Sequence, residues 1–149
     1  MTETSAASAA AAPVEVGTKA DATDVGPLTT RMFVRNAGAS GDFNPMHYDD
    51  TLAQLAGYPS VFAQGMLSAA LLASFAVDWL GAENVRRYRV RFREQVWPGD
   101  VLTCSGEVTA VEQAADGWLA TVELAATRQT GGTAVSATAA FLFPSCPYP

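Results

Sequence analysis

The amino-acid sequence predicts an α+β fold in which an antiparallel sheet surrounds one long buried helix. The first observation is the run Gly65–Leu80, which is apolar on almost every side, as is typical of a helix enclosed by protein. The second is a series of four strand-like segments that follows this helix. The third is the turn chemistry between these segments, since Asp-Gly and Gly-Gly pairs join neighbouring antiparallel strands.

The composition is that of one folded domain. The chain has 149 residues, of which 49% are apolar, and its formal net charge is −6. There is no basic excess to neutralise phosphates, which argues against nucleic acid as a partner. Two cysteines, Cys104 and Cys146, are too few for a disulfide framework and have no metal-ligand spacing around them. We therefore expect a cytoplasmic protein without a metal site, in which Cys104 is a small core residue.

The two ends of the chain differ from its central part. Residues 1–13 are rich in Ala, Ser and Thr, and Met1–Ala12 lacks both the basic and the apolar parts of a secretory signal. We expect a disordered leader there. The Pro-rich segment 144–149 cannot continue a strand or a helix and predicts a surface tail. The folded domain is therefore expected over residues 14–143.

Short elements are expected before the long helix. Val14–Ala20 is typical of a strand that enters the fold. Thr29 or Thr30 is placed to cap a short helix that runs over 31–37. Gly38 is expected to end this helix.

A second short helix and the central helix follow. Asp49 or Asp50 can cap a helix that extends to about Ala56. The segment Gly65–Leu80 predicts a helix about 24 Å long. It is shorter than the roughly eighteen or more apolar residues of a membrane span, and strand-like segments follow it. We therefore expect this helix inside the protein, and no membrane partner.

The rest of the chain predicts an antiparallel sheet. Its strand-like segments are Arg86–Val96, Val101–Val111, Trp118–Thr127 and Thr133–Phe143. Turn residues separate each segment from the next, which indicates consecutive hairpins. A sheet of this kind that curls around the central helix is a hot-dog fold. Its unpaired edge predicts pairing with a second subunit, in a homodimer or in a heterodimer with a related hot-dog subunit.

One short segment has the composition of a catalytic loop. His47 is the only histidine of the chain, and Asp42 lies five residues before it. Around them, Gly41 permits unusual φ values, Asn44 favours turns and Pro45 fixes φ. We expect a rigid loop that holds Asp42 and His47 in one fixed relation, which suits acid–base chemistry near neutral pH.

The segment Ser40-Gly-Asp-Phe-Asn-Pro-Met-His47 resembles the hydratase motif of the MaoC-like (R)-specific enoyl-CoA hydratases and 3-hydroxyacyl-thioester dehydratases. The segment Ala63-Gln-Gly-Met66 stands where that family usually has Ala-His-Gly-Met, at the start of the central helix. Arg91-Phe92, together with Val96-Trp-Pro-Gly-Asp100, resembles the strand and turn that follow the helix in the family. The resemblance extends over nearly the whole chain, from Val14 to Phe143.

The resemblance implies a hydro-lyase that adds water reversibly to a trans-2-enoyl thioester and gives an (R)-3-hydroxyacyl thioester. It implies that Asp42 and His47 together hold the water and share the proton transfers, and that the backbone amide of Gly65 stabilises the thioester oxygen. The acyl group would be presented on coenzyme A or on an acyl carrier protein, without a cofactor or a metal. The chemistry suits these residue types, because water needs a base and a helix N-terminus offers a free N–H. The residues expected to shape the loop are Ser40, Gly41, Asn44 and Pro45.

Two further positions near the central helix are candidate pocket residues. Gln64 replaces the His that is common in the family, and we expect it to influence how the loop is held or which acyl group fits. Ser74 is the nearer positional match to a serine that contacts the catalytic pair in some relatives. For Ser68 we favour a bond to a carbonyl of its own helix over a place in the pocket.

The basic residues are concentrated in one strand-like segment. Five of the nine Lys and Arg residues lie within eight positions, and these are Arg86, Arg87, Arg89, Arg91 and Arg93. Two interpretations stay open. The row is either a solvated face of the sheet or a site for the phosphates of coenzyme A or a carrier protein.

Three other functions remain as alternatives to an independent hydratase. The chain could be the catalytic subunit of a heteromeric dehydratase, a hot-dog acyl-thioesterase or a noncatalytic acyl-binding module. The loop around Asp42 and His47 is not typical of the thioesterases. The presence of both residues also argues against a noncatalytic module and for the catalytic half of a heteromer.

Overall fold

The computed structural model describes residues 14–144. The predicted leader, Cys146 and the predicted tail beyond Pro144 lie outside the described residues. The elements follow the order β1 (Thr23–Val25), α1 (Thr30–Ser40), a one-turn helix (Pro45–His47), α2 (Asp50–Leu55), α3 (Gly65–Leu80), a second one-turn helix (Ala82–Asn84), β2 (Val85–Phe92), β3 (Leu102–Ala114), β4 (Gly117–Arg128) and β5 (Thr133–Phe143).

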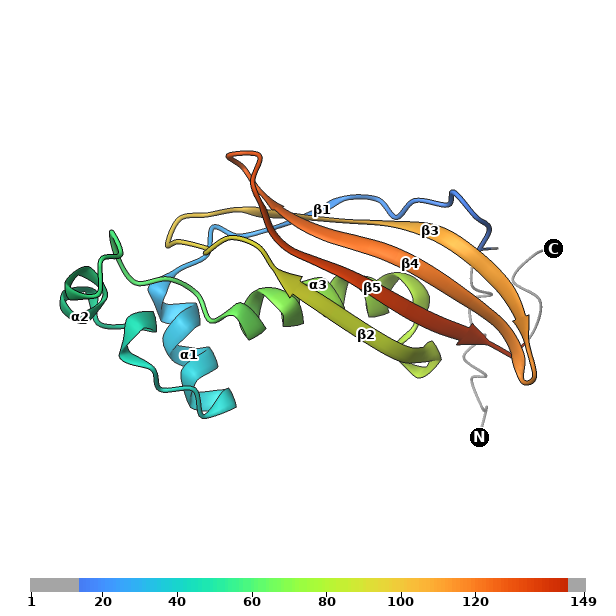
Figure 1. Ribbon diagram of the computed structural model, residues 1–149, viewed down its shortest axis with the longest axis horizontal. Coiled ribbons are helices and arrows are strands. Elements are labelled where there is room, and N and C mark those ends of the chain that lie inside the picture. Colours follow the sequence, from blue (N-terminus) through green and yellow to red (C-terminus); the bar gives the residue numbers. More distant parts are fainter. Residues whose placement is uncertain (1–13, 145–149) are drawn as a thin grey trace, which may run out of the picture.

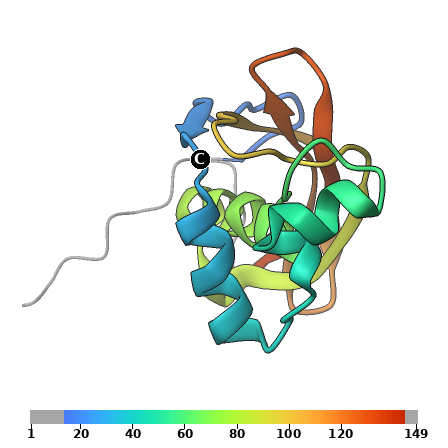
Figure 2. The same cartoon turned by 90° about the vertical axis from the view of Figure 1, so that its left-hand side faces the viewer.

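The five strands form one antiparallel sheet that curves along α3 (Figure 1). Its strand order is β1-β3-β4-β5-β2. The hairpins β3–β4 and β4–β5 agree with the predicted meander, whereas β2 pairs with β5 and not with its sequence neighbour β3. The short helices α1 and α2 lie at the end of the molecule where α3 begins (Figure 2). This arrangement confirms the predicted hot-dog fold.

The helix α3 forms the centre of the core. Leu72 and Ala76 are buried on the helix, and Val122 and Phe141 are buried on the sheet. At one point the sheet comes so close to the helix that only glycine fits. A Cβ at Gly106 of β3 would lie 2.8 Å from the Leu124 side chain and 3.0 Å from the Trp79 ring. The sheet therefore follows one side of the helix closely, whereas Met66, Ala70, Ser74 and Asp78 along another side are exposed, so α3 is less enclosed than predicted.

Two ionisable side chains, Tyr88 and Cys104, lie in or against this core in their neutral forms. Tyr88 of β2 donates its hydroxyl hydrogen to the backbone carbonyl of Ala69 in α3 at 2.8 Å, and burial raises the pKa of its phenol to about 12. Cys104 is a free, fully buried thiol, and burial raises its pKa to about 11. The thiol therefore stays protonated, and the prediction that Cys104 is a small core residue is confirmed.

A buried carboxylate fixes the connection between β2 and β3. Asp100 is 4% exposed, and its oxygens accept hydrogen bonds from Arg128 Nε at 2.7 Å, Gln129 Nε2 at 3.0 Å and the Trp97 amide at 2.8 Å. Burial by itself would raise the pKa of Asp100, but the hydrogen bonds outweigh it and the pKa lies below its usual range. Arg128 also binds Glu94 at 3.2 Å, so the network holds both ends of the connection.

Two predicted boundaries near the N-terminus are wrong. Gly38 does not end α1, because the helix continues to Ser40 and Gly41 caps it in the left-handed conformation, with φ of 77°. Glycine inside a helix costs only about 1 kcal/mol and does not by itself stop it. Val14–Ala20 forms no continuous strand; a single bridge joins Lys19 to Glu107, and the first strand begins at Thr23.

We predict that Asp100→Asn lowers the free energy of unfolding by about 1.5–3 kcal/mol at pH 7, because it removes charged hydrogen bonds to Arg128. A carboxyl group with a lowered pKa stabilises the fold above its unfolded pKa of about 3.9 and loses this effect as the pH falls through the folded pKa. Urea unfolding at pH 7 and near pH 3 should therefore show the difference shrinking in acid. Asp116→Asn, at the exposed β3–β4 turn, is the control, and a difference independent of pH would contradict the prediction.

Candidate active site

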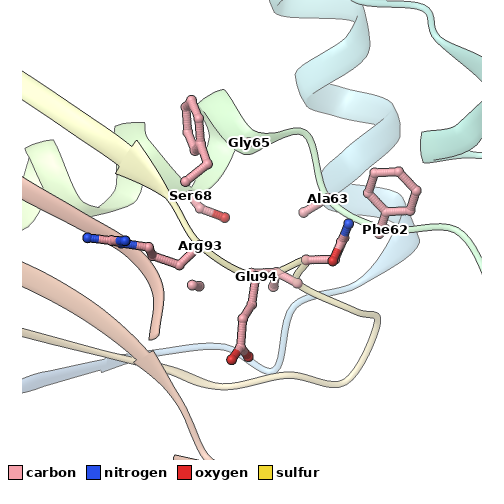
Figure 3. A pocket seen from close by; sticks show the side chains of 10 residues that line it. Phe62, Ala63, Gly65, Ser68, Arg93 and Glu94 are labelled. Carbon is pink, nitrogen blue, oxygen red and sulfur yellow. The ribbon is translucent and has the colours of Figure 1, made fainter. Parts of the chain in front are cut away.

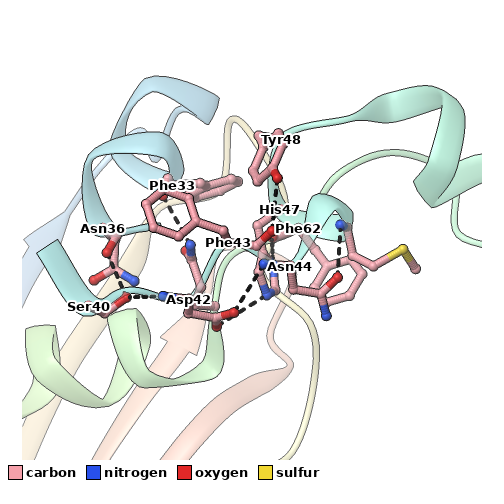
Figure 4. Close-up of polar contacts among 11 residues, drawn as sticks. Phe33, Asn36, Ser40, Asp42, Phe43, Asn44, His47, Tyr48 and Phe62 are labelled. Carbon is pink, nitrogen blue, oxygen red and sulfur yellow. Dashed lines mark hydrogen bonds and ion pairs between the residues drawn. The ribbon is translucent and has the colours of Figure 1, made fainter. Parts of the chain in front are cut away.

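The end of α1 leads directly into a loop held by its own side chains (Figure 4). Ser40 donates its hydroxyl hydrogen to the Asn36 carbonyl at 2.7 Å and accepts the Asp42 amide at 3.2 Å. Asp42 Oδ1 in turn accepts the Asn44 amide at 3.3 Å, and Asn44 Oδ1 accepts the Met46 amide at 3.2 Å. Each side chain thus fixes the backbone two residues ahead or four behind, which gives the loop one shape.

The loop ends in a single helical turn that carries His47 into the protein. Asn44 caps the turn and Pro45 occupies its first position, where a missing N–H costs nothing. The His47 side chain is only 8% exposed, whereas that of Asp42 is 49% exposed. The site therefore combines a sheltered imidazole with a carboxylate that solvent and ligands can reach.

The orientation of the imidazole is set by a backbone carbonyl. His47 Nδ1 lies 2.7 Å from the carbonyl oxygen of Phe62. Because a carbonyl can only accept, Nδ1 must carry the hydrogen, and in the neutral ring Nε2 keeps its lone pair. The Phe62 ring also meets the imidazole edge-on, with centroids 5.2 Å apart. These contacts leave Nε2 as the atom that can act as a base.

Nε2 faces the carboxylate of Asp42, and the two groups are 3.7 Å apart at Asp42 Oδ2 (Figure 4). This separation is too long for a direct hydrogen bond. When the imidazole is neutral, Nε2 and the Asp42 carboxylate oxygen are both acceptors. A molecule with two O–H donors can therefore bridge them. Water is such a molecule, and contact with two acceptors would increase its nucleophilic character.

The segment 61–64 connects this loop to the rest of the fold. The Val61 amide donates to Asp50 Oδ1 at 2.9 Å, and the Phe62 amide donates to the Met46 carbonyl at 3.3 Å. The Ala63 amide donates to the Val96 carbonyl at 2.8 Å, across to the β2–β3 connection. The carbonyl that orients His47 is therefore fixed by contacts on both sides of its own residue.

The helix α3 begins at Gly65, immediately after this segment. The first amides of a helix have no carbonyl partner within it, and the helix dipole makes this end attractive to negative charge. A Cβ at Gly65 would lie 3.1 Å from two ring carbons of Phe92. Glycine therefore lets the Phe92 ring pack closely against the start of the helix.

A cavity of about 310 Å³ lies beside the start of α3 (Figure 3). The residues that line it are Phe62, Ala63, Gly65, Ser68, Phe92, Arg93, Glu94, Gln95, Val96 and Ala134. Asp42 and His47 are not among them, so these two residues lie outside this volume. Phe62 links the two, because it lines the cavity and its carbonyl holds His47.

The structure places the two predicted pocket residues elsewhere. Ser74 is exposed and does not line the cavity, whereas Ser68, one turn into α3, is 4% exposed and lines it. Gln64 is 1% exposed and points toward α1, where its Nε2 donates to the Phe33 carbonyl at 3.0 Å. Its Oε1 has no hydrogen-bond partner among the described residues. Spacing of three residues from Gly65 is the signal that could have identified Ser68.

The described residues give two further findings. Residues 14–144 contain no cluster of three or more His, Cys, Asp or Glu side chains that could hold a metal ion. Within the same range, no helix has both the length and the apolar character that a membrane span requires.

Comparison with known proteins identifies the family. The family model described as a MaoC like domain matches residues 11–130. The chain belongs to the MaoC-like dehydratase family. Among its relatives is the 3-oxo-4,17-pregnadiene-20-carboxyl-CoA hydratase beta subunit of Mycobacterium tuberculosis, which is 33% identical over 106 residues, or 70% of this chain and 78% of the relative. This confirms the family that the sequence motif predicted.

Other curated relatives are much longer proteins. The peroxisomal hydratase-dehydrogenase-epimerase of Saccharomyces cerevisiae is 36% identical over 63 residues, which are 42% of this MaoC-like chain and 7% of that protein. The chain likewise spans 24% of the 3-hydroxyacyl-thioester dehydratase X of Mycobacterium tuberculosis, at 39% identity over 70 residues and 46% of the chain.

Solved structures show the same fold over nearly all of the described residues. The (R)-hydratase from A. caviae involved in PHA biosynthesis has a TM-score of 0.77 and 28% identity, covering 88% of this chain and 98% of that chain. A chain of the ChsH1-ChsH2 complex from Mycobacterium tuberculosis has a TM-score of 0.76 and 25% identity, covering 87% and 98%.

We predict that Gln64→Glu lowers the free energy of unfolding by about 1–3 kcal/mol, because a buried carboxylate cannot donate to the Phe33 carbonyl. Gln64→Leu should be milder, since it loses the same hydrogen bond but also removes the unpaired Oε1. Urea unfolding measures both, with Gln113→Glu at an exposed position of β3 as the control. Equal losses at Gln64 and Gln113 would show that the Phe33 contact contributes nothing.

Proposed function

We propose that this MaoC-like protein catalyses the reversible hydration of trans-2-enoyl thioesters to (R)-3-hydroxyacyl thioesters. The observation that carries the proposal is the orientation of His47. Its Nδ1–H is bound by Phe62, and its Nε2 faces the Asp42 carboxylate at 3.7 Å. A water between these two acceptors is the nucleophile that hydration requires.

In the proposed reaction, the water hydroxyl adds to C3 of the enoyl group and a proton is added to C2. The pair Asp42 and His47 takes one proton from the water and returns one to C2, so it ends the cycle in its starting state. Both groups face the same water position, and the two transfers are therefore assigned to the pair. The sheltered position of the imidazole keeps bulk water away from the exchange.

Negative charge develops on the thioester oxygen as water adds. We assign its stabilisation to the Gly65 amide, which lies at the start of a helix of 16 residues. The cavity beside Gly65 offers a place for the thioester group. Loss of one such donor typically costs about 2.7–4 kcal/mol in the transition state. The roles of Ser40, Gly41, Asn44 and Pro45 follow from their contacts or position in the loop, which they hold in one shape.

The substrate is proposed to be a thioester of coenzyme A or an acyl carrier protein, handled without a cofactor. We propose assembly through the free edge of β2, either with a second copy or with a related hot-dog subunit. The hydratase beta subunit at 33% identity favours the heteromeric form. A cytoplasmic location stays a prediction, in keeping with the free thiol of Cys104.

We predict that the purified chain removes the conjugated enoyl absorbance of crotonyl-CoA without releasing free thiol. Asp42→Asn and His47→Gln should each lower kcat by about 10²–10⁴-fold, because a side-chain amide cannot take a proton from the reacting water. Asp21→Asn, an exposed carboxylate far along the chain from the loop, should retain the wild-type rate.

The same assay separates the competing functions. Release of free thiol would identify an acyl-thioesterase and contradict the proposal. Activity that begins only after a second hot-dog subunit is added would identify the catalytic subunit of a heteromer. A fully active Asp42→Asn or His47→Gln variant would exclude the mechanism, whichever assembly is correct.

A further inference from the structure

A groove of about 720 Å³ runs along the outer face of β2 and β5. The side chains of β2 alternate, so that Tyr88 and Val90 are partly buried against the core while the arginines between them are exposed. The residues that line the groove are Arg87, Arg89, Val90, Arg91, Arg93, Glu123, Ser136, Ala137 and Thr138. Four guanidinium groups therefore face one open channel on a protein whose net charge is −6.

These arginines lack acidic partners in the fold. Within residues 14–144, the Lys and Arg ion pairs involve Lys19 and Arg128, and none involves an arginine of the groove. Glu123 is the only acidic residue of the lining, and its Oε1 accepts the Thr138 hydroxyl at 2.8 Å. Successive groove arginines are about 7 Å apart along the strand, so their charges repel each other. An anion bound between them would relieve this repulsion.

The groove adjoins the proposed active site. Arg93 lines both the groove and the cavity beside Gly65. In Figure 3 the Arg93 side chain points away from Phe62 and Ala63. A ligand with an anionic end in the groove and a neutral arm directed past Arg93 would thus reach the start of α3.

We propose that this groove binds the phosphates of a coenzyme A thioester, an inference that rests on the proposed function. Guanidinium groups bind phosphate oxygens in a bidentate way. Coenzyme A carries a diphosphate and a 3′-phosphate on one small ligand, which suits a row of several arginines. The arm of a carrier protein brings only one phosphodiester. The pantetheine portion of coenzyme A is uncharged and fits the path past Arg93 to the cavity.

The test compares two thioesters of the same acyl group. Crotonyl-CoA has the phosphates, and crotonyl-pantetheine lacks them. In the triple variant Arg87→Gln/Arg89→Gln/Arg91→Gln, the ratio of the KM for crotonyl-CoA to the KM for crotonyl-pantetheine should rise about tenfold or more. Added salt should raise the same ratio in the wild-type protein, because exposed charges are screened.

A charge-matched variant controls for the change in net charge. Arg31→Gln/Arg35→Gln/Arg86→Gln removes three exposed arginines that do not line the groove. Arg86 is a matched position on β2, where its guanidinium donates to the backbone carbonyls of Glu83 and Val85. This variant should keep the wild-type KM ratio. An equal rise of the KM ratio in the groove variant and in the control variant would overturn the proposal, since it would reflect net charge alone.

A binding measurement makes the inference independent of turnover. Adenosine 3′,5′-bisphosphate, titrated calorimetrically, should bind the wild-type protein and the control variant, with affinity about tenfold lower in the groove variant. If the groove variant had the wild-type affinity and the wild-type KM ratio, the phosphate site would be overturned even if hydration is observed. If the groove variant lost activity with crotonyl-carrier protein but not with crotonyl-CoA, the coenzyme A site would also be overturned, in favour of a docking site for the carrier protein. If the wild-type protein bound adenosine 3′,5′-bisphosphate but hydrated neither thioester, the proposed function would be contradicted and the phosphate site would not.

Discussion

The hydrogen bond between His47 Nδ1 and the Phe62 carbonyl, at 2.7 Å, is the contact on which the site depends. It determines which ring nitrogen carries the hydrogen, and it turns the other nitrogen toward Asp42. The carbonyl is itself fixed, because the flanking amides of residues 62 and 63 bind Met46 and Val96. The tautomer of one imidazole thus depends on the correct packing of the loop, the segment 61–64 and the β2–β3 connection.

The central helix explains why these parts meet. An apolar helix needs cover, and the sheet buries the side of α3 that carries Leu72 and Ala76, while Met66 and Ala70 on another side are exposed. Its first residue, Gly65, lines a cavity together with Phe92. The arginine row of the edge strand β2 ends beside the same cavity, because Arg93, directly after the strand, lines both the groove and the cavity. The proposed oxyanion donor at the start of α3 and the arginine-lined groove therefore lie next to the same cavity.

The sequence predicted the features that local chemistry decides. The bounds of α3 agree with the apolar run, and the loop around Asp42 has the side-chain contacts expected of Asn44 and its neighbours. The pairing of β2 with β5 was not predictable from turn residues, because it depends on contacts far apart in the chain. The role of Phe62 had no signal either, since the group that binds His47 is a backbone carbonyl. The sequence did not indicate which face of α3 Ser74 occupies, nor that Gln64, which precedes the helix, would bind the Phe33 carbonyl in α1.

The most direct test is the nitrogen-15 spectrum of the imidazole in the free protein. Since the chain has a single histidine, every imidazole signal comes from His47. At a pH where the ring is neutral, we predict a hydrogen on Nδ1 and the shift of an unprotonated ring nitrogen at Nε2. A neutral ring with its hydrogen on Nε2 would contradict the assignment of Nε2 as the base that faces the reacting water.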